Sequence, residues 1–459
     1  MHTEQIDLFE TMPVHKAVIK LSLPSIMGQI ILVIYNLADT YYVGLTGRDE
    51  MITAVTVCLP AFMFLSAISN LFGIGGGAAY SRALGRKNRK RCCNVASHAL
   101  FGCIAVSAVY CLMAAVFRDA YVDLLGGRDA LVHGISVQYL LITVVLGGMT
   151  TAAGAMLAHL IRADGHSASA GTGVILGGVL NILLDPLFMF VILPSGNEVL
   201  GAAIATALSN LASCIYFAAV IRKNSTLVFR YGEDAFRDGS MRELVMTGLP
   251  ACMMTLLENI SYAFLDALMA GYGIAAQAGV GVAKKINMLA HAIVRGLSQG
   301  VLPFFAYNYA AKNDMRLRKA FRLTAGSAVC VSAVLCVSYL LMAPQLVSLF
   351  ILPQSRSLYY GIVFLRILCI GCPFSAFAYT VISFFQAVNR GIRSFFLAIL
   401  RKGTADIPMM FLFRQFFGAK GITAATPAAD LVCAGVSAVL ITKWIKVRHR
   451  QAADIQEAV

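Results

Sequence analysis

Long apolar segments alternate with short polar ones along the whole chain of 459 residues. Each apolar segment approaches the ~20 residues that an α-helix needs to cross a bilayer, and continuous apolar runs of that length are typical of transmembrane helices. The pattern therefore predicts an all-α membrane protein with twelve transmembrane helices. The predicted spans cover residues 21–43, 53–80, 93–116, 134–160, 168–193, 200–221, 244–271, 276–309, 323–342, 358–387, 394–413 and 422–442.

The eighth predicted span differs from the others because basic residues interrupt it, namely Lys284, Lys285, His291 and Arg295. Ionisable groups inside a membrane usually face the interior of the bundle or a water-filled cavity. We therefore expect this helix to be long, tilted and in part exposed to an aqueous cavity.

The two halves of the chain resemble each other at a nearly constant offset of 220 to 226 residues. The recurring stretches are GAAIAT at 201–206 with GITAAT at 421–426, LP at 23–24 with LP at 249–250, and GRKN at 85–88 with AAKN at 310–313. An even number of helices in each half gives both halves the same orientation, as in a parallel repeat. We expect two pseudo-symmetric six-helix bundles, an N-lobe of residues 1–230 with helices 1–6 and a C-lobe of residues 231–459 with helices 7–12.

Charged residues are scarce and unevenly placed. They make up 13% of the chain, about half the share in soluble domains, while 59% of residues are hydrophobic and the net charge is +14. With both termini in the cytoplasm, the inside segments hold 25 Lys and Arg residues and the outside segments six. This asymmetry follows the positive-inside rule. It predicts a multi-pass protein of the inner (plasma) membrane with cytoplasmic termini, and it explains the basic excess without a nucleic-acid partner.

The cysteines and the N-terminal residues exclude other interpretations of the chain. Nearly all twelve cysteines fall in or beside apolar spans, as small hydrophobic residues do, and Cys369 and Cys372 have no second pair or His cluster to complete a zinc site. We expect no disulfide framework. Glu4, Asp7 and Glu10 precede a first apolar run that is too long for a signal peptide, so we expect that span to be retained.

Asp39 lies inside the first apolar span, in the run YNLADT at residues 35–40. A charged side chain at the centre of a membrane helix costs roughly 2.5–3.5 kcal/mol on insertion scales, so an acid retained there predicts that an ion is bound or passed on. Tyr35 lies four residues earlier and shares a helix face with Asp39. Asn181 and Asp185 share a face of the fifth span in the same way. Together with Thr206 of the sixth span, these side chains predict an oxygen-rich cluster.

Such a cluster suits either of two ions. Oxygen ligands bind hard cations such as Na⁺, and a carboxyl group in a low-dielectric setting beside another acid readily takes up a proton. The residues leave H⁺ and Na⁺ open. In a purely structural alternative, the polar side chains join helices by hydrogen bonds, and Asp185 serves the bend at Pro186.

The second half also carries acids within its predicted spans. Glu258 and Asp266 lie eight residues apart in the seventh span and roughly on one face. They predict either proton uptake or attraction of a cationic substrate, and the alternative is that they pair with the basic residues of the eighth span. In the eleventh span Arg401 and Asp406 are near neighbours, and we expect them to pair with each other.

Several of these stretches resemble the MATE (multidrug and toxic compound extrusion) family, in particular its bacterial multidrug exporters. The matching stretches are LP at 23–24, YNLADT at 35–40, FGIGG at 72–76, NILLDP at 181–186, GAAIAT at 201–206, GLSQGVLP at 296–303, YNY at 307–309 and FQA at 385–387. They span almost the entire chain in register, which is far more specific than any one motif.

The resemblance implies secondary active antiport, in which organic, cationic and amphipathic compounds or drugs leave in exchange for H⁺ or Na⁺ by rocker-switch alternating access. It implies a protein that works as a monomer, with small-molecule substrates, the lipid bilayer around it, and no cofactor beyond the coupling ion. The cation-coupling residues implied are Asp39, Asp185, Asn181, Thr206 and Tyr35. Na⁺ is the one metal ion that this site would take, at Asp39, Asn181, Asp185 and Thr206.

A secondary or substrate-contacting set is assigned to Glu258, Asp266, Gln299 and Asn36. Some similar transporters use acids on both the seventh and tenth spans. Glu258 fits the seventh span, but the tenth predicted span, residues 358–387, contains no acid, so an ion site of that two-acid type is not expected.

Two other functions compete with this prediction. A flippase for a lipid-linked saccharide or another amphipathic metabolite predicts a strongly basic central cavity, which Lys284, Lys285 and Arg295 favour and the acids of the N-lobe oppose. A membrane-embedded enzyme needs a nucleophile with a base, or a metal constellation, and neither is evident. We therefore expect a transporter and not an enzyme.

Overall fold

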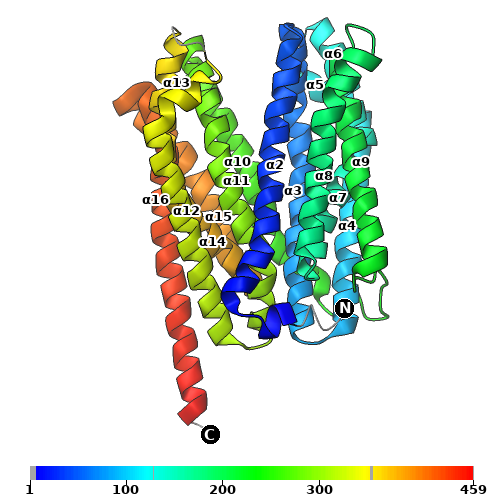
Figure 1. Ribbon diagram of the computed structural model, residues 1–459, viewed down its shortest axis with the longest axis vertical. Coiled ribbons are helices and arrows are strands. Elements are labelled where there is room, and N and C mark those ends of the chain that lie inside the picture. Colours follow the sequence, from blue (N-terminus) through cyan, green and yellow to red (C-terminus); the bar gives the residue numbers. More distant parts are fainter. Residues whose placement is uncertain (1–6, 128, 352–354, 458–459) are drawn as a thin grey trace.

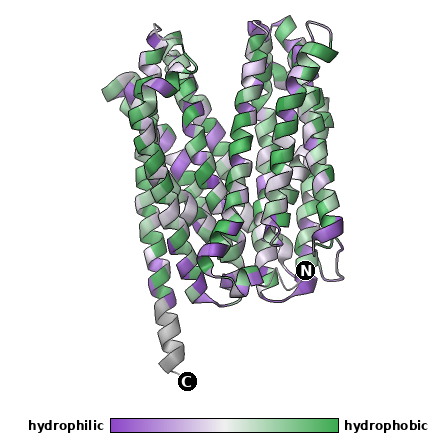
Figure 2. Cartoon of the chain, in the orientation of Figure 1, coloured by the Kyte–Doolittle hydropathy of each residue, from purple (hydrophilic) through white to green (hydrophobic). Residues whose placement is uncertain are grey.

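The computed structural model describes residues 7–127, 129–351 and 355–457, and within these ranges every regular element is a helix. Most of the helices are long and run along the height of the molecule (Figure 1). Hydrophobic residues cover much of their length, and hydrophilic residues are frequent at the lower end, where both ends of the chain lie (Figure 2). This distribution is that of helices which cross a bilayer.

The elements of the first half are η1 (Asp7–Thr11), α2 (Val14–Leu45), α3 (Asp49–Gly85), α4 (Arg89–Val116), α5 (Arg118–Leu124), α6 (Ala130–Leu140), η2 (Leu141–Leu146), α7 (Gly148–Ala163), α8 (Ser167–Pro186), η3 (Leu187–Ile192) and α9 (Glu198–Asn224). Those of the second half are α10 (Ser240–Ala270), α11 (Ile274–Ala310), α12 (Asp314–Ser348), α13 (Arg356–Cys369), α14 (Cys372–Ala387), α15 (Gly391–Ile399), η4 (Leu400–Thr404) and α16 (Asp406–Glu457). The four η elements are short π-helical segments.

The predicted all-α membrane fold with twelve spans is confirmed. By length and composition alone, eight of the described helices could cross a membrane, or ten if each of two bent pairs counts as one span. The basic helix α11 adds another, and α16 adds the last because it holds two helices joined at Gly418. There φ is +58° and ψ −136°, a backbone conformation that glycine adopts without steric cost.

The helices form two groups (Figure 1). Helices α2–α9 pack mainly on one another, for example α2 on α8 and α3 on α7, and helices α10–α16 do the same, for example α11 on α13 and α14 on α16. Helices α2–α9 are called the N-group and helices α10–α16 the C-group.

The two ends of the bundle also need names. The end that carries both ends of the chain is called the terminal end, and the other is called the opposite end. Contacts between the groups run mainly through α3 with α10 and α2 with α11.

Glycines let α3 and α10 cross at very short range. A Cβ atom at Gly248 of α10 would lie 1.8 Å from the carbonyl oxygen of Leu71, and one at Gly75 of α3 would lie 2.4 Å from that of Leu244. Small residues allow this close approach of membrane helices. A larger residue at either position would force the two groups apart near the terminal end.

Helices α2 and α11 cross in the same manner. A Cβ atom at Gly296 of α11 would lie 2.6 Å from the Cα atom of Ile26, and one at Gly300 would lie 2.9 Å from the carbonyl oxygen of Leu21. Gly300 follows Gly75 by 225 residues, which is the offset of the sequence repeat. The crossing of α3 with α10 thus recurs as the crossing of α11 with α2.

A buried arginine ties the two groups together at the terminal end. Arg82 of α3 donates to the Glu243 carboxylate at 2.6 Å and to the Thr247 hydroxyl at 2.9 Å, both on α10. Its Nη1 atom also donates to the carbonyl oxygens of Gln386 and Ala387 at 2.9 and 3.0 Å. These carbonyls end α14, where the helix dipole is negative and favours a cation.

Hydrogen bonds between the groups do not continue to the opposite end. The outermost of them runs from the Asn70 amide to the Thr255 hydroxyl at 2.8 Å, near the middle of α10. Among the described residues, no hydrogen bond joins the two groups between this pair and the opposite end, and there α2 diverges from α10 and α11 (Figure 1). The bundle is therefore closed between its two groups at the terminal end only.

Candidate functional site

Three helices of the N-group bring together the polar residues singled out in the sequence. Asn181 and Asp185 lie on α8, and Thr206 lies on α9. The Asn181 amide donates to Asp185 Oδ1 at 3.1 Å and to the Thr206 hydroxyl at 3.2 Å. Tyr35 and Asp39 of α2 complete the cluster, because Tyr35 is close enough to interact electrostatically with both acids. All five residues are therefore neighbours.

The cluster contains more acceptor oxygens than donors. Asp39 Oδ1, Asn181 Oδ1 and Asp185 Oδ2 are buried atoms without a hydrogen-bond partner in the part of the chain that the structure describes. Buried polar atoms are nearly always satisfied, and an ionised carboxylate can only accept. A proton on either carboxyl group, or a small cation among the oxygens, would satisfy them. The arrangement is thus suited to binding a positive ion.

Sequence reasoning missed Tyr139 as a member of this cluster. Tyr139, near the end of α6, interacts electrostatically with Asp39, Asp185 and Tyr35. A tyrosine in an apolar span resembles any other packing aromatic residue, so no sequence signal distinguished it.

Lys285 is the cation that faces the cluster from the other group. This α11 side chain interacts electrostatically with Asp39 across the space between the N-group and the C-group. Among the described residues it forms no ion pair within 4.0 Å, unlike its neighbour Lys284. Asp39 therefore has a basic residue nearby without being locked to it.

The cluster lies where the two groups are apart. Asp39 is six residues from the end of α2 at Leu45, and so about 9 Å from it at the helical rise. Asp185 is the last residue before Pro186, after which α8 gives way to the π-helical segment η3. Such segments are frequent at functional sites, and proline removes a backbone donor there. Both features weaken the regular helix beside the acid.

Two other residues of the predicted secondary set differ in their distance from the cluster. The Asn36 amide donates to the carbonyl oxygen of Leu32 on its own helix at 2.6 Å, and the Asn36 side chain also hydrogen-bonds to Tyr35 of the cluster. Gln299 shares a narrow crevice with His159 and Arg162 of α7. It is fourteen residues from Lys285 along α11, about 21 Å at the helical rise. The structure therefore does not bring Gln299 to the Asp39 cluster.

Glu258 and Asp266 of α10 each pair with a basic residue of α11, which was the alternative left open by the sequence. Glu258 accepts from Arg295 at 2.7 Å and from the Tyr379 hydroxyl at 3.2 Å. Asp266 accepts from Lys284 at 2.6 Å. Tyr379 lies on α14, within the predicted tenth span, and joins this network through Glu258 and Arg295.

The predicted pairing of Arg401 with Asp406 is wrong. Arg401 donates to Asp430 of α16 at 2.7 Å, and its guanidinium lies 4.2 Å from the centre of the Tyr379 ring. Asp406 pairs instead with Lys402 at 2.9 Å. Lys402 precedes Asp406 by four residues and shares its helix face, whereas Arg401 precedes it by five and turns toward α16.

These buried pairs give a stability prediction. Asp430→Asn leaves the Arg401 guanidinium buried without a counter-charge, and breaking a buried pair in this way costs about 3–5 kcal/mol. We expect a clearly lower unfolding temperature in detergent, and much of it regained in the double variant Arg401→Met with Asp430→Leu. Asp266→Asn is the control, because the Asp266 side chain is 42% exposed. Equal effects of Asp430→Asn and the control would contradict the prediction.

The described residues do not form a binding site for a multivalent metal ion. They contain no group of three or more His, Cys, Asp or Glu side chains that could hold a metal ion. The cysteines are free thiols, including Cys369 and Cys372. The oxygen cluster around Asp39, with its two acids, is the arrangement suited to a monovalent cation.

Known proteins resemble the chain over its whole length. The chain is 30% identical over 474 residues to the multidrug export protein MepA of Staphylococcus aureus (strain NCTC 8325 / PS 47), with all of both chains covered. It is 27% identical over 455 residues to the protein of the same name from Staphylococcus haemolyticus (strain JCSC1435), covering 99% of this chain and 98% of that one.

Solved structures share the fold. A crystal structure of MATE in complex with MaL6 superposes with a TM-score of 0.90 at 23% identity, covering 97% of this chain and 99% of that one. A multidrug resistance MATE family transporter in an outward-facing conformation superposes with a TM-score of 0.88 at 22% identity and the same coverage. The MatE family model matches twice, at residues 24–187 and 250–412. The chain therefore belongs to the MATE family, whose members are membrane transporters and not enzymes, as its sequence motifs predicted.

Proposed function

We propose that the chain is a secondary active antiporter of the bacterial plasma membrane, which exports organic, cationic and amphipathic compounds in exchange for H⁺ or Na⁺. The relatives named multidrug export proteins support the export of drugs. The family supports transport as such. The coupling to an ion rests on the residues of this chain.

The observation that carries the proposal is the set of three unpartnered oxygens on Asp39, Asn181 and Asp185. A ligand shifts a conformational balance only by its different affinities for the two states. A proton or Na⁺ that satisfies these oxygens stabilises the conformation in which they converge. Tyr35, Thr206 and, from the structure, Tyr139 complete the proposed coupling site.

The two-group architecture supports alternating access. In this proposal residues 1–230 and 231–459 are lobes that rock about the glycine crossings, since a parallel repeat around a central site suits such movement. With the basic terminal end in the cytoplasm, closure at that end makes this conformation outward-open. The coupling ion then reaches Asp39 from outside, and the substrate leaves by the same opening. We propose that a single copy of the chain suffices.

Charge pairing disfavours the flippase alternative. That function draws support from Lys284, Lys285 and Arg295, but Lys284 pairs with Asp266 and Arg295 with Glu258. Among the described residues, Lys285 keeps its charge without an ion pair and faces Asp39 instead. The same pairing weakens the attraction of Glu258 for a cationic substrate. In the part of the chain that the structure describes, Asp39 and Asp185 of the N-group and Lys285 of the C-group are left without an ion pair, so the interior carries no excess of unpaired positive charge.

Efflux of a fluorescent cation tests the proposed function. Cells that express the chain are expected to accumulate less ethidium than cells with the empty vector. In liposomes, an imposed proton or Na⁺ gradient should drive ethidium movement, and whichever gradient does so identifies the coupling ion. Movement of the dye that neither gradient affects would contradict antiport.

A further inference from the structure

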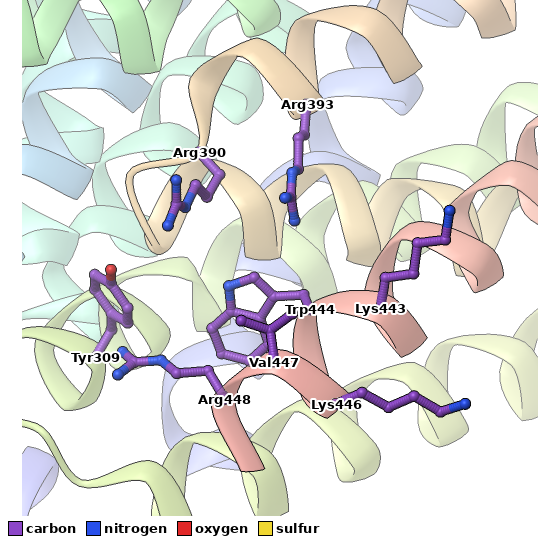
Figure 3. A pocket seen from close by; sticks show the side chains of 8 residues that line it. All are labelled: Tyr309, Arg390, Arg393, Lys443, Trp444, Lys446, Val447 and Arg448. Atoms are coloured by element: carbon purple, nitrogen blue, oxygen red, sulfur yellow. The ribbon is translucent and has the colours of Figure 1, made fainter. Parts of the chain in front are cut away.

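A strongly basic cleft lies at the terminal end of the C-group, far along the chain from the Asp39 cluster. It has a volume of about 470 Å³, within the ~300–1,000 Å³ that is usual for ligand pockets. Its basic lining comes from the turn before α15, from α15 itself and from α16, and consists of Arg390, Arg393, Lys443, Lys446 and Arg448. Trp444 of α16 and Tyr309 of α11 are its aromatic lining, and these seven residues define the basic cleft (Figure 3).

The positive charge of the basic cleft is almost unopposed. No carboxylate lines it, and the one ion pair of its side chains joins Arg448 to Asp314 at 3.9 Å, among the described residues. Helix α15 adds to this charge because Arg390 precedes its first residue, Arg393 follows in the first turn, and no acid lies there. The first turn of a helix carries a partial positive charge and favours anions. Two arginines at this position add to that charge, so binding of an anion there would be favourable.

The surroundings of the cleft are those of a membrane surface. Trp444 is only 6% exposed and packs against Phe384 with ring centres 5.0 Å apart, so it forms part of the floor of the cleft. Leu431, Val432 and Val439 of the same helix are exposed, and Lys443 follows them on the exposed side. An apolar strip on α16 therefore leads up to the cleft. A lipid can place its headgroup among the cations and its acyl chains along this strip.

We propose that the basic cleft binds the phosphate headgroup of an anionic phospholipid. Basic pockets between membrane helices on the cytoplasmic side suit such headgroups, and the planar guanidinium group matches phosphate oxygens two at a time. Figure 3 shows Arg393 extended toward Trp444 and Arg448 extended toward Tyr309, so the arginines flank the aromatic floor. The apolar strip favours a lipid over free phosphate, because only a lipid has acyl chains that can pack against it.

The chain offers its own probe of this site, since Trp444 is its single tryptophan. The protein is reconstituted into vesicles of phosphatidylcholine and phosphatidylglycerol in which one lipid or the other carries bromine on its acyl chains. Bromine quenches indole fluorescence at short range, and the buried Trp444 is accessible mainly from the cleft that it lines. At equal mole fractions, brominated phosphatidylglycerol is expected to quench Trp444 more strongly than brominated phosphatidylcholine.

The double variant Arg390→Gln and Arg393→Gln is expected to lose this preference. Each basic residue near an anionic lipid surface contributes on the order of 1 kcal/mol, so two of them change the relative affinity by roughly tenfold or more. The matched control is Arg222→Gln with Lys223→Gln, which removes the same charge from the exposed end of α9 in the N-group. The control should retain the preference of the native protein.

Three results would overturn the proposal. The first is equal quenching by the two brominated lipids in the native protein. The second is loss of the preference in the control as well, which would indicate a general effect of net charge. The third is displacement of the lipid by inorganic phosphate at low millimolar concentration, which would assign the basic cleft to a free anion. Unchanged unfolding temperatures of both variants show that their folds are intact.

Discussion

Asp39→Asn is expected to reduce ion-driven export of ethidium to the level of vesicles without protein. Asparagine has nearly the same shape but cannot take up a proton and carries no charge. Asp185 is then the one acid left in the cluster, without the second carboxylate that strengthens its attraction for a positive ion. Because the substitution removes a charge from a membrane helix, where charges cost several kcal/mol, folding should not suffer. The measurement is dye transport in liposomes with an imposed gradient, at matched protein content.

Asp49→Asn provides the control for this experiment. Asp49 begins α3 at the same end of the N-group and is exposed, so the variant loses the same charge outside the cluster. It should transport like the native protein. Gradient-driven transport of native rate by Asp39→Asn would remove the basis of the proposed coupling site, and so would an equal loss in both variants.

Arg82→Met is expected to open the terminal end. The Arg82 guanidinium contacts α10 and α14, and these contacts must break when the two groups separate there. Glu243 keeps a second partner in Arg91 of α4, so the cost is smaller than the ~3–5 kcal/mol of a buried pair that is broken completely. A cost of only ~1.4 kcal/mol already shifts a conformational equilibrium about tenfold. Molecules that are closed at the terminal end would then coexist with molecules that are open there, or the open molecules would predominate.

Pulsed electron paramagnetic resonance can measure this change. Spin labels introduced as unnatural amino acids at Lys223 of α9 and Lys319 of α12 report the separation of the groups at the terminal end, since both residues are exposed there. We expect a longer distance to gain population in Arg82→Met. Lys90→Gln is the control, because its pair with Asp234 lies on the surface and surface pairs contribute little. Identical distance distributions in Arg82→Met and the native protein would argue against the role of Arg82.

The amino-acid pattern alone predicted the fold class and most of the candidate site. Apolar runs long enough to cross a bilayer have few alternatives to a membrane helix, because the backbone must satisfy its own hydrogen bonds in lipid. The same physics makes acids such as Asp39 costly and therefore informative. Residues four apart share a helix face, so the spacing by itself predicted that Tyr35 lies beside Asp39 and Asn181 beside Asp185.

Only the tertiary structure decided which faces meet. Within one helix, spacing defines neighbours, but contacts between helices depend on how each is rotated and how deep it lies, and spacing does not contain this information. Tyr139 joined the cluster and Gln299 did not for this reason. Arg401 likewise found Asp430, far away in sequence, because the π-helical segment η4 and the packing of α16 brought them together.

The direction in which the bundle is closed is also a tertiary property. Nothing in the spacing of residues predicted that Gly75 and Gly248 meet across the two groups, or that Arg82 closes the bundle beside this crossing. The sequence by itself thus determined that this chain spans a membrane with acids in its interior. The reason is that burying a charge, or a backbone polar group without a hydrogen bond, costs much free energy, and this cost depends on the residues of a single segment. Which partners those acids have, and at which end the groups touch, depended on packing between distant helices.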